Sequence, residues 1–244
     1  MEDISLGVNV FEFIQKAYEE HFDRKLNKLG CSELPFGAKK TLISRLFNIP
    51  VQMNMKMLHG KIHHAIIQKP EVLESIILSI SNQIGLENPP ITTYEIEKVV
   101  SYDFSKNKGI EGHIDVETPN FLIEIKTTSV PLKFYSKDIA PFHYIQLNTY
   151  LGIEKMDLGF LLSINLQAYQ SQIINLNDVM RKYAYVVPIE FDQEIFDLTL
   201  EKAKTMLDCL EAGSYEMLCP EYEWECKTCT PEIKKICING KIKA

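Results

Sequence analysis

The chain has 244 residues, of which 45% are hydrophobic and 24% are charged, which suits one enlarged globular domain or a domain with an appendage. Its net charge of −7 argues against a protein that coats nucleic acid without specificity. No apolar stretch approaches the ~20 residues that span a bilayer, and the first residues lack the basic and apolar segments of a signal peptide. We therefore expect a cytoplasmic protein with no membrane partner.

The N-terminal part of the chain is expected to be helical. Apolar residues recur at helical spacing over 8–28, and similar patterns follow over roughly 51–68 and 71–84. These segments define an N-terminal helical region over 1–90.

After this region the periodicity changes to that of β-strands. Residues 94–104, 110–117 and 121–128 are rich in β-branched and aromatic side chains, and turn-forming residues separate them. Because both connections are short, the three strands are expected to pair in order as an antiparallel meander.

Helices and strands then alternate. The segment 143–153 returns to a helical period, 156–169 and 183–191 are strand-like, and 192–212 is an amphipathic helix. A parallel crossover from the last strand of the meander through the first of these helices would give an α/β fold. Its core, placed at 91–212, is a mixed central β-sheet flanked by helices.

Two carboxylates and a lysine lie on neighbouring predicted strands. Asp115 is followed nine residues later by Glu124, and Lys126 comes two residues after that. Because alternate residues of a strand point to the same face, the side chains of Glu124 and Lys126 leave the strand together. The short turn between the strands brings Asp115 alongside, so the three charged groups converge.

The neighbours of these charges favour a buried strand. Leu122, Ile123 and Ile125 suit burial, whereas a buried charge costs several kcal/mol unless it is paired or binds a metal. Two adjacent carboxylates repel each other unless a cation lies between them, and their hard oxygen atoms suit Mg²⁺ or Mn²⁺. Such an ion polarises a phosphate and activates water for phosphodiester hydrolysis, with Lys126 orienting the water or stabilising the transition state. The alternative is a surface ion pair between Glu124 and Lys126.

Other polar residues lie near this constellation. Gln146 and Tyr150 are four residues apart on the following helix, so they share a face and could hold a phosphate or a base. As isolated residues they would more often be partly buried helix side chains. A group of lysines either supplies local cations or is ordinary solvated surface, namely Lys98, Lys106, Lys108, Lys126, Lys133 and Lys137.

Four motifs in this order resemble the RecB-like branch of the PD-(D/E)XK nucleases: GKIHH at 60–64, GHID at 112–115, EIK at 124–126 and QLNTY at 146–150. The resemblance implies a restriction-endonuclease-like core. In that branch a histidine four residues after a glycine on an early helix is an extra metal ligand. The resemblance implies that this histidine is His64, which follows Gly60, with the adjacent His63 as the alternative. The implied metal ligands are His64, Asp115, Glu124 and the backbone carbonyl of Ile125. The implied catalytic residues are Asp115, Glu124, Lys126, Gln146 and Tyr150.

The cysteines form a second signal. Cys226, Cys229 and Cys237 lie close together within the segment 213–244, which otherwise has little regular pattern. Disulfides are not expected in a reducing compartment. A C-x-x-C pair can direct two thiolates to one iron–sulfur cluster, which normally requires four, or to Zn²⁺; free thiols are the remaining alternative.

The fourth cysteine is either Cys31, far away in sequence, or the nearer Cys219. One cysteine near the N-terminus and three near the C-terminus resemble the iron–sulfur subgroup of this nuclease branch. That subgroup includes the CRISPR-associated RecB-like exonucleases and the AddB-type helicase-nucleases. The resemblance implies a 4Fe–4S cluster that joins the two ends of the chain around the nuclease core, held by Cys31, Cys226, Cys229 and Cys237.

The constellation predicts a divalent-metal-dependent DNA nuclease. The resemblance implies an exonuclease that acts on single-stranded ends with 5′–3′ polarity. It implies either a role in CRISPR spacer acquisition beside the integrase complex, as antiviral defence, or a stand-alone viral or repair nuclease. A viral nuclease would act in the host cytoplasm. The alternatives are a non-catalytic DNA-end or protein-binding module that keeps the fold, and a redox or metal sensor based on the cysteines.

Overall fold

The computed structural model describes the chain in six blocks, residues 26–49, 60–61, 64–128, 141–165, 184–215 and 229–242. Its helical elements are η1 (Cys31–Glu33), α2 (Ala38–Leu46), α4 (Pro70–Gln83), α6 (Pro141–Glu154), α8 (Gln193–Glu211) and α10 (Pro231–Ile242). Its strands are β1 (Lys28–Gly30), β2 (Glu95–Ser105), β3 (Lys108–Glu117), β4 (Leu122–Thr128), β5 (Leu158–Asn165) and β6 (Ala184–Glu190).

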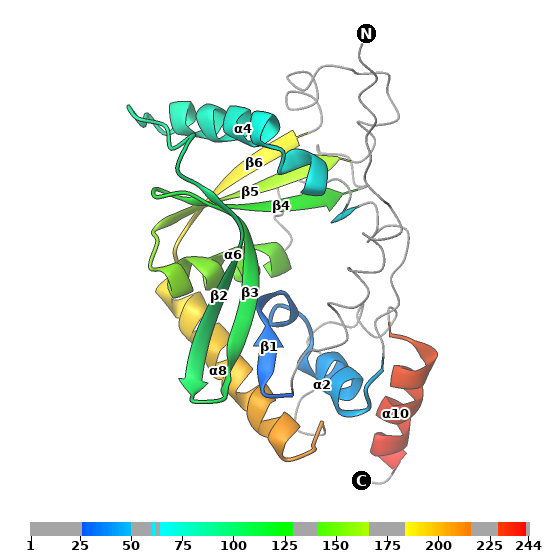
Figure 1. The fold of residues 1–244 in the computed structure, drawn as a ribbon. Coiled ribbons are helices and arrows are strands. Elements are labelled where there is room, and N and C mark those ends of the chain that lie inside the picture. The colour runs from blue at the N-terminus through cyan, green and yellow to red at the C-terminus, as the bar shows by residue number, and fades with distance from the viewer. Residues whose placement is uncertain are drawn as a thin grey trace.

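The described strands form one mixed six-stranded sheet (Figure 1). Its order is β1-β3-β4-β5-β6, and β2 also pairs with β3. The strands β2, β3 and β4 pair antiparallel in chain order, so the predicted meander is confirmed. The strands β4 and β5 are parallel with α6 between them in the chain, so the predicted crossover and the mixed α/β fold are confirmed as well.

Helices cover both faces of the sheet, and the alternation of residues along β4 decides which face each side chain reaches. Ile123 and Ile125 belong to one buried core together with residues of α4, whereas Leu122 belongs to a second core with residues of α6 and α8. Figure 1 shows the same arrangement, with α4 on one side of the β4–β6 strands and α6 and α8 on the other. Glu124 alternates with the isoleucines, so it lies on the α6 side.

The N-terminal region supplies a strand that the helical periodicity did not predict. The helix expected over 8–28 is wrong at its end, because Lys28 begins β1, which pairs in parallel with the first half of β3. The remainder of that helix lies outside the described residues. Arg45 of α2 donates a hydrogen bond to the carbonyl of Lys28 over 2.6 Å, and this contact fixes β1 against the unpredicted helix α2.

The C-terminal segment also differs from the expectation. Little regular structure was predicted from residue 213 onward, but α10 occupies 231–242. Pro231 is its first residue, a position where the missing backbone N–H has no partner to lose. No helix in the described blocks is both long enough and apolar enough to cross a bilayer.

Several predicted features lie outside the described residues. Of the helix expected over 51–68, only residues 60–61 and 64–68 are described; 60–61 and 64–67 are helical, and Gln68 is in a turn. The other features concerned are His63, Lys133, Lys137, Cys219 and Cys226.

A buried asparagine joins α6 to the start of α8. The side chain of Asn148 is fully buried; its Nδ2 donates to the carbonyl of Asp192 over 2.9 Å, and its Oδ1 accepts from the backbone N–H of Asp192 over 2.8 Å. Asp192 in turn caps α8, because its carboxylate accepts from the backbone N–H of Ile195 over 3.1 Å. The two helices that cover the Glu124 face are therefore fixed to each other.

The substitution Asn148→Ala is expected to lower the free energy of unfolding by about 1–3 kcal/mol, because it leaves the backbone N–H of Asp192 without its partner. The carbonyl of Asp192 still accepts from the backbone N–H of Phe196 over 3.1 Å. The comparison variant Asp192→Ala removes only the cap and is expected to cost about 1 kcal/mol. Urea unfolding followed by circular dichroism measures both values. A cost for Asn148→Ala no larger than that for Asp192→Ala would contradict this account of the α6–α8 junction.

Candidate active site

The predicted carboxylates lie where β3 and β4 separate. The two strands pair only at Val116 with Ile123 and at Glu117 with Leu122. Beyond these pairs a side chain replaces the backbone partner: Oδ2 of Asp115 accepts a hydrogen bond from the backbone N–H of Ile125 over 2.6 Å. A carboxylate thus bridges the opening between the strands.

Glu124 carries a buried charge that its protein partners satisfy only in part. Its side chain is 2% exposed, Lys126 Nζ donates to its Oε1, and its Oε2 has no hydrogen-bond partner. Burial raises the pKa of Glu124 to about 7, the charge of Asp115 adds to the rise, and Lys126 opposes it. Two carboxylates and one ammonium group leave an excess of negative charge that a cation would neutralise.

His64 reaches this site from the helical turn that precedes α4. Its Nδ1 lies 3.3 Å from Oδ1 of Asp115. Burial acts to lower the pKa of His64, but the hydrogen bond and charge of Asp115 outweigh it, so the pKa is raised. Gly60 lies against β4 in the same region, where a Cβ atom would be 3.2 Å from Thr127 Oγ1. The structure therefore brings the predicted ligands His64 and Asp115 into contact.

Gln146 and Tyr150 lie on the buried face of α6. Gln146 Nε2 donates to Tyr150 Oη over 3.2 Å, and both residues are buried. Burial and the charge of Glu124 raise the pKa of Tyr150 well above its usual range, so it stays a neutral hydroxyl. A Cβ atom on Gly112 would lie 2.8 Å from Tyr150 Oη and 3.0 Å from Cys31 Cβ, so only glycine fits there. The glycine of the GHID motif thus makes room for Tyr150.

The sequence motifs did not indicate two residues that lie near Asp115, Glu97 and Gln68. The ligand atoms of His64, Glu97 and Asp115 all lie within 4.8 Å of one another, and within the described blocks no other three histidine, cysteine or acidic residues do so. Gln68 Nε2 donates to Glu97 Oε1 over 2.7 Å and approaches the carbonyl of Asp115 at 3.4 Å. Glu97 alternates with Glu95 on a predicted strand, and such a pattern is typical of a solvated face.

His143 lies near Lys126 at the start of α6. Burial and the charge of Lys126 lower the pKa of His143 to about 3, so the imidazole is neutral at physiological pH. A neutral imidazole can accept a hydrogen bond from a water or a substrate hydroxyl beside the lysine.

Two of the clustered lysines are paired with carboxylates, which favours the interpretation of these residues as ordinary surface. Lys98 contacts carboxylates of β3 and α6, and Lys108 contacts two carboxylates of α8. These partners are Glu117 and Glu154 for Lys98, and Asp208 and Glu211 for Lys108.

The described cysteines do not gather around one point with other ligands. Cys31 is fully buried in the core, and burial together with the charge of Glu124 raises its pKa to about 12, which disfavours a thiolate. Cys229 and Cys237 are half-buried at and before α10, and Cys226 lies outside the described residues. Cys209 is buried on α8 as a small core residue.

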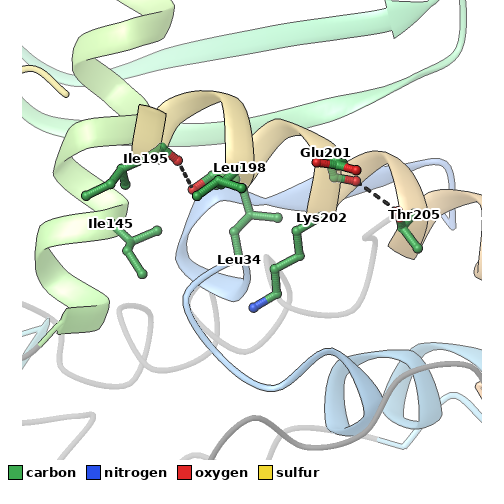
Figure 2. Close-up of a pocket in the computed structure, with 8 residues that line it drawn as sticks. Leu34, Ile145, Ile195, Leu198, Glu201, Lys202 and Thr205 are labelled. Carbon is green, nitrogen blue, oxygen red and sulfur yellow. Dashed lines mark hydrogen bonds between the residues drawn. The ribbon is translucent and has the colours of Figure 1, made fainter. Parts of the chain in front are cut away.

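A cavity of about 490 Å³ along α8 is separate from this site (Figure 2). Its threonine hydroxyls are bonded within the helix, Thr199 to the carbonyl of Ile195 over 2.7 Å and Thr205 to that of Glu201 over 3.0 Å. None of the constellation residues lines it. The lining residues are Leu34, Ile145, Ile195, Leu198, Thr199, Glu201, Lys202 and Thr205. This lining contains one carboxylate, Glu201, so it does not supply the pair of acids that Asp115 and Glu124 form.

The carboxylate site fits a divalent cation. Carboxylate and imidazole groups are ligands that Mg²⁺ and Mn²⁺ accept. The unpartnered Oε2 of Glu124 and the raised pKa of this residue both indicate a buried acid whose charge Lys126 compensates only in part. His64, Asp115 and Glu124 would hold the ion, and Glu97 is a further carboxylate within reach of the first two.

Comparisons with known proteins identify the fold. No protein-family model matches the chain, and no curated protein is similar to it in sequence. The crystal structure of the protein SSO0001 is similar, with a TM-score of 0.60 and 18% identity over 93% of this chain and 95% of that chain. An alkaline exonuclease from Laribacter hongkongensis, LHK-Exo, has a TM-score of 0.53 and 14% identity over 93% of this chain and 100% of that chain. Its complex with dAMP has a TM-score of 0.51 and 15% identity over the same shares. The chain therefore has an exonuclease-like fold, and the predicted nuclease-like core is confirmed at this level.

The substitution Glu124→Gln is expected to change how stability depends on pH. The pKa of Glu124 is raised from an ordinary 4.5 to about 7, so the metal-free folded protein binds this proton more tightly than the unfolded chain does. The stability associated with that proton is present below pH 4.5 and is lost as the pH rises through about 7. A shift of this size corresponds to about 3 kcal/mol.

Urea unfolding with a chelator at pH 5 and pH 8 measures the effect. Glu124→Gln should be more stable than wild type at pH 8 and lose less stability between the two pH values. Equal losses in the two proteins would mean that Glu124 titrates normally, contrary to this account of its environment.

Proposed function

We propose that this protein is a divalent-metal-dependent DNA exonuclease. The observation that carries the proposal is the grouping of Asp115, Glu124 and Lys126 at the split between β3 and β4, with one buried carboxylate oxygen left without a partner. The fold shared with an alkaline exonuclease supports it.

The proposed reaction is hydrolysis of a phosphodiester. Water attacks the phosphorus atom, the P–O bond to the leaving nucleotide breaks, and the leaving oxygen takes up a proton. A bound divalent cation would polarise the phosphate and lower the pKa of the attacking water. Lys126 orients that water and stabilises the negative charge of the transition state, and Glu124 positions the lysine through their ion pair.

The residues of α6 complete the proposed substrate site. Tyr150 and Gln146 lie beside Glu124, and the neutral hydroxyl and the amide suit contacts with a phosphate or a base. The complex of LHK-Exo with dAMP supports a nucleotide as ligand of this fold. The proposed preference for single-stranded ends, the 5′–3′ polarity and the role beside the CRISPR integrase complex rest on the motif resemblance, as does the alternative of viral or repair DNA processing.

The substitution Lys126→Ala is expected to reduce DNA cleavage by more than about 100-fold, or roughly 3 kcal/mol of barrier. End-labelled single-stranded and duplex DNA, incubated with Mg²⁺ or Mn²⁺, gives the rate, and the label reveals the polarity. Lys108→Ala is the matched control, because this lysine is paired with α8 at the other end of the β2–β3 hairpin. It should cleave as wild type does.

Retained cleavage in Lys126→Ala would remove the lysine from the mechanism. A folded wild-type protein that binds DNA but cleaves nothing with either ion would favour the non-catalytic DNA-binding module instead.

The second part of the proposal is an iron–sulfur cluster bound by Cys226, Cys229, Cys237 and either Cys31 or Cys219. It rests on the cysteine spacing and the resemblance. Of these two candidates, Cys31 is fully buried at the start of η1, and Cys219 lies outside the described residues.

Protein purified without oxygen is expected to contain about four iron atoms per chain and to absorb visible light. Cys226→Ser and Cys229→Ser should lose both signals, and comparison of Cys31→Ser with Cys219→Ser identifies the fourth ligand. Cys209→Ser is the control and should keep the cluster. Zinc in place of iron would support the Zn²⁺ alternative, and no metal in wild type would contradict a metal-binding role for these cysteines.

A further inference from the structure

His143 lies on the same face of α6 as Gln146 and Tyr150. The three residues are spaced by three and by four positions, so on a helix their side chains line up along one side. Gln146 and Tyr150 are buried, whereas His143, in the first turn of α6, is half-buried. His143 is therefore the member of this polar row over the Glu124 face that a substrate can reach most easily.

The two described histidines of the site are influenced by different charges. The carboxylate of Asp115 contacts His64, and the charges of Lys126 and Glu124 act on His64 as well. Among the described groups, Lys126 is the one charge that acts on His143. His64 therefore belongs to the acidic side of the site, and His143 belongs to the side of the lysine.

The imidazole of His143 is a neutral hydrogen-bonding group. Burial and the charge of Lys126 lower its pKa to about 3, so at physiological pH one ring nitrogen carries a proton and the other does not. No hydrogen bond to this imidazole occurs within the described part of the chain. One N–H donor and one nitrogen acceptor are therefore available beside an ammonium group.

Aromatic rings pack against this imidazole and restrict its orientation. The ring of Phe142 meets it at 74°, with 4.4 Å between the ring centroids. Phe142 in turn stacks on Phe36, with 5.6 Å between the centroids and 25° between the planes. Lys202 of α8 donates to the carbonyl of Phe36 over 3.0 Å. Segments far apart in the sequence thus hold the ring in place, which suits a residue that positions a substrate.

The surroundings of His143 favour a negatively charged ligand. The first turn of α6 contains no acidic residue, and the start of a helix carries partial positive charge. A phosphate oxygen between Lys126 and His143 would accept from the ammonium group and from the imidazole N–H. Because the imidazole is neutral, it donates this hydrogen bond without placing a second positive charge next to the lysine.

We infer that His143 binds the scissile phosphate: its imidazole N–H donates to a non-bridging oxygen on the side of Lys126, while the carboxylates hold the cation on the other side. This inference rests on the proposed function and deepens it, because it adds a substrate-binding residue to the lysine. The contact stabilises negative charge on the phosphate in the transition state, so its loss is expected to lower kcat more than it changes KM.

Cleavage of single-stranded DNA by variants at position 143 tests the contact. His143→Phe keeps a ring against Phe142 but lacks the donor, so kcat should fall by roughly 10-fold or more. His143→Gln keeps a donor in its amide and should recover part of this rate. Tyr144→Phe is the matched control, because it loses a hydroxyl in the same helical turn, on which the charge of Asp192 acts. It should cleave as wild type does.

A sulfur substitution in the DNA separates a phosphate contact from a structural effect. Sulfur is a weak hydrogen-bond acceptor, so one phosphorothioate diastereomer at the cleaved linkage should slow the wild-type protein. The same diastereomer should slow His143→Phe much less, because the contact is already absent. Equal sulfur effects in the two proteins, or a wild-type rate in His143→Phe, would overturn the inference and leave the proposed nuclease in place.

Nuclear magnetic resonance of isotope-labelled histidine tests the contact without cleavage. A short oligothymidylate, added with a chelator, should shift the imidazole N–H signal of His143, which is assigned by its absence in His143→Phe. Bound oligonucleotide that leaves this signal unchanged would overturn the inference. A shift in a protein that cleaves nothing with Mg²⁺ or Mn²⁺ would support the phosphate contact and contradict the proposed nuclease.

Discussion

The site depends on two carboxylates held together at the split between β3 and β4. Asp115 replaces a missing backbone partner by accepting from Ile125 N–H, and this bond fixes its carboxylate beside Glu124. Glu124 is buried and receives one ion pair, from Lys126. Repulsion between buried acids is unfavourable for stability, and a divalent cation is a partner that would relieve it.

The elements around this pair are arranged to hold it in place. The helix α6 packs over the Glu124 face and supplies Gln146 and Tyr150, and Asn148 of the same helix fixes the start of α8. Gly112 leaves the space that Tyr150 fills. Rigid support of this kind suits the proposed catalysis by positioned charges, because a small displacement of the acids would change their distance to a bound cation.

Much of this arrangement could be predicted from the sequence. The strands of the meander have clear alternation and short turns, so their pairing is local, and the position of Asp115 opposite Glu124 follows directly. The strand β1 could not be predicted, because three residues show no period and their partners on β3 lie far along the chain. Glu97 was missed for a different reason. Its alternation with Glu95 is that of a wet strand face, and its place beside Asp115 follows only from the register of β2 on β3. The cysteine cluster stays a prediction, because its ligands lie partly outside the described residues.

The most direct test of this account is a crystal structure of the Mn²⁺-loaded protein with anomalous scattering from manganese. The account predicts an anomalous peak within coordination distance of the carboxylates of both Asp115 and Glu124, with Lys126 moved little from its contact with Glu124. Well-ordered carboxylates with no peak between them at saturating Mn²⁺ would contradict it, and the buried charge of Glu124 would then need another explanation.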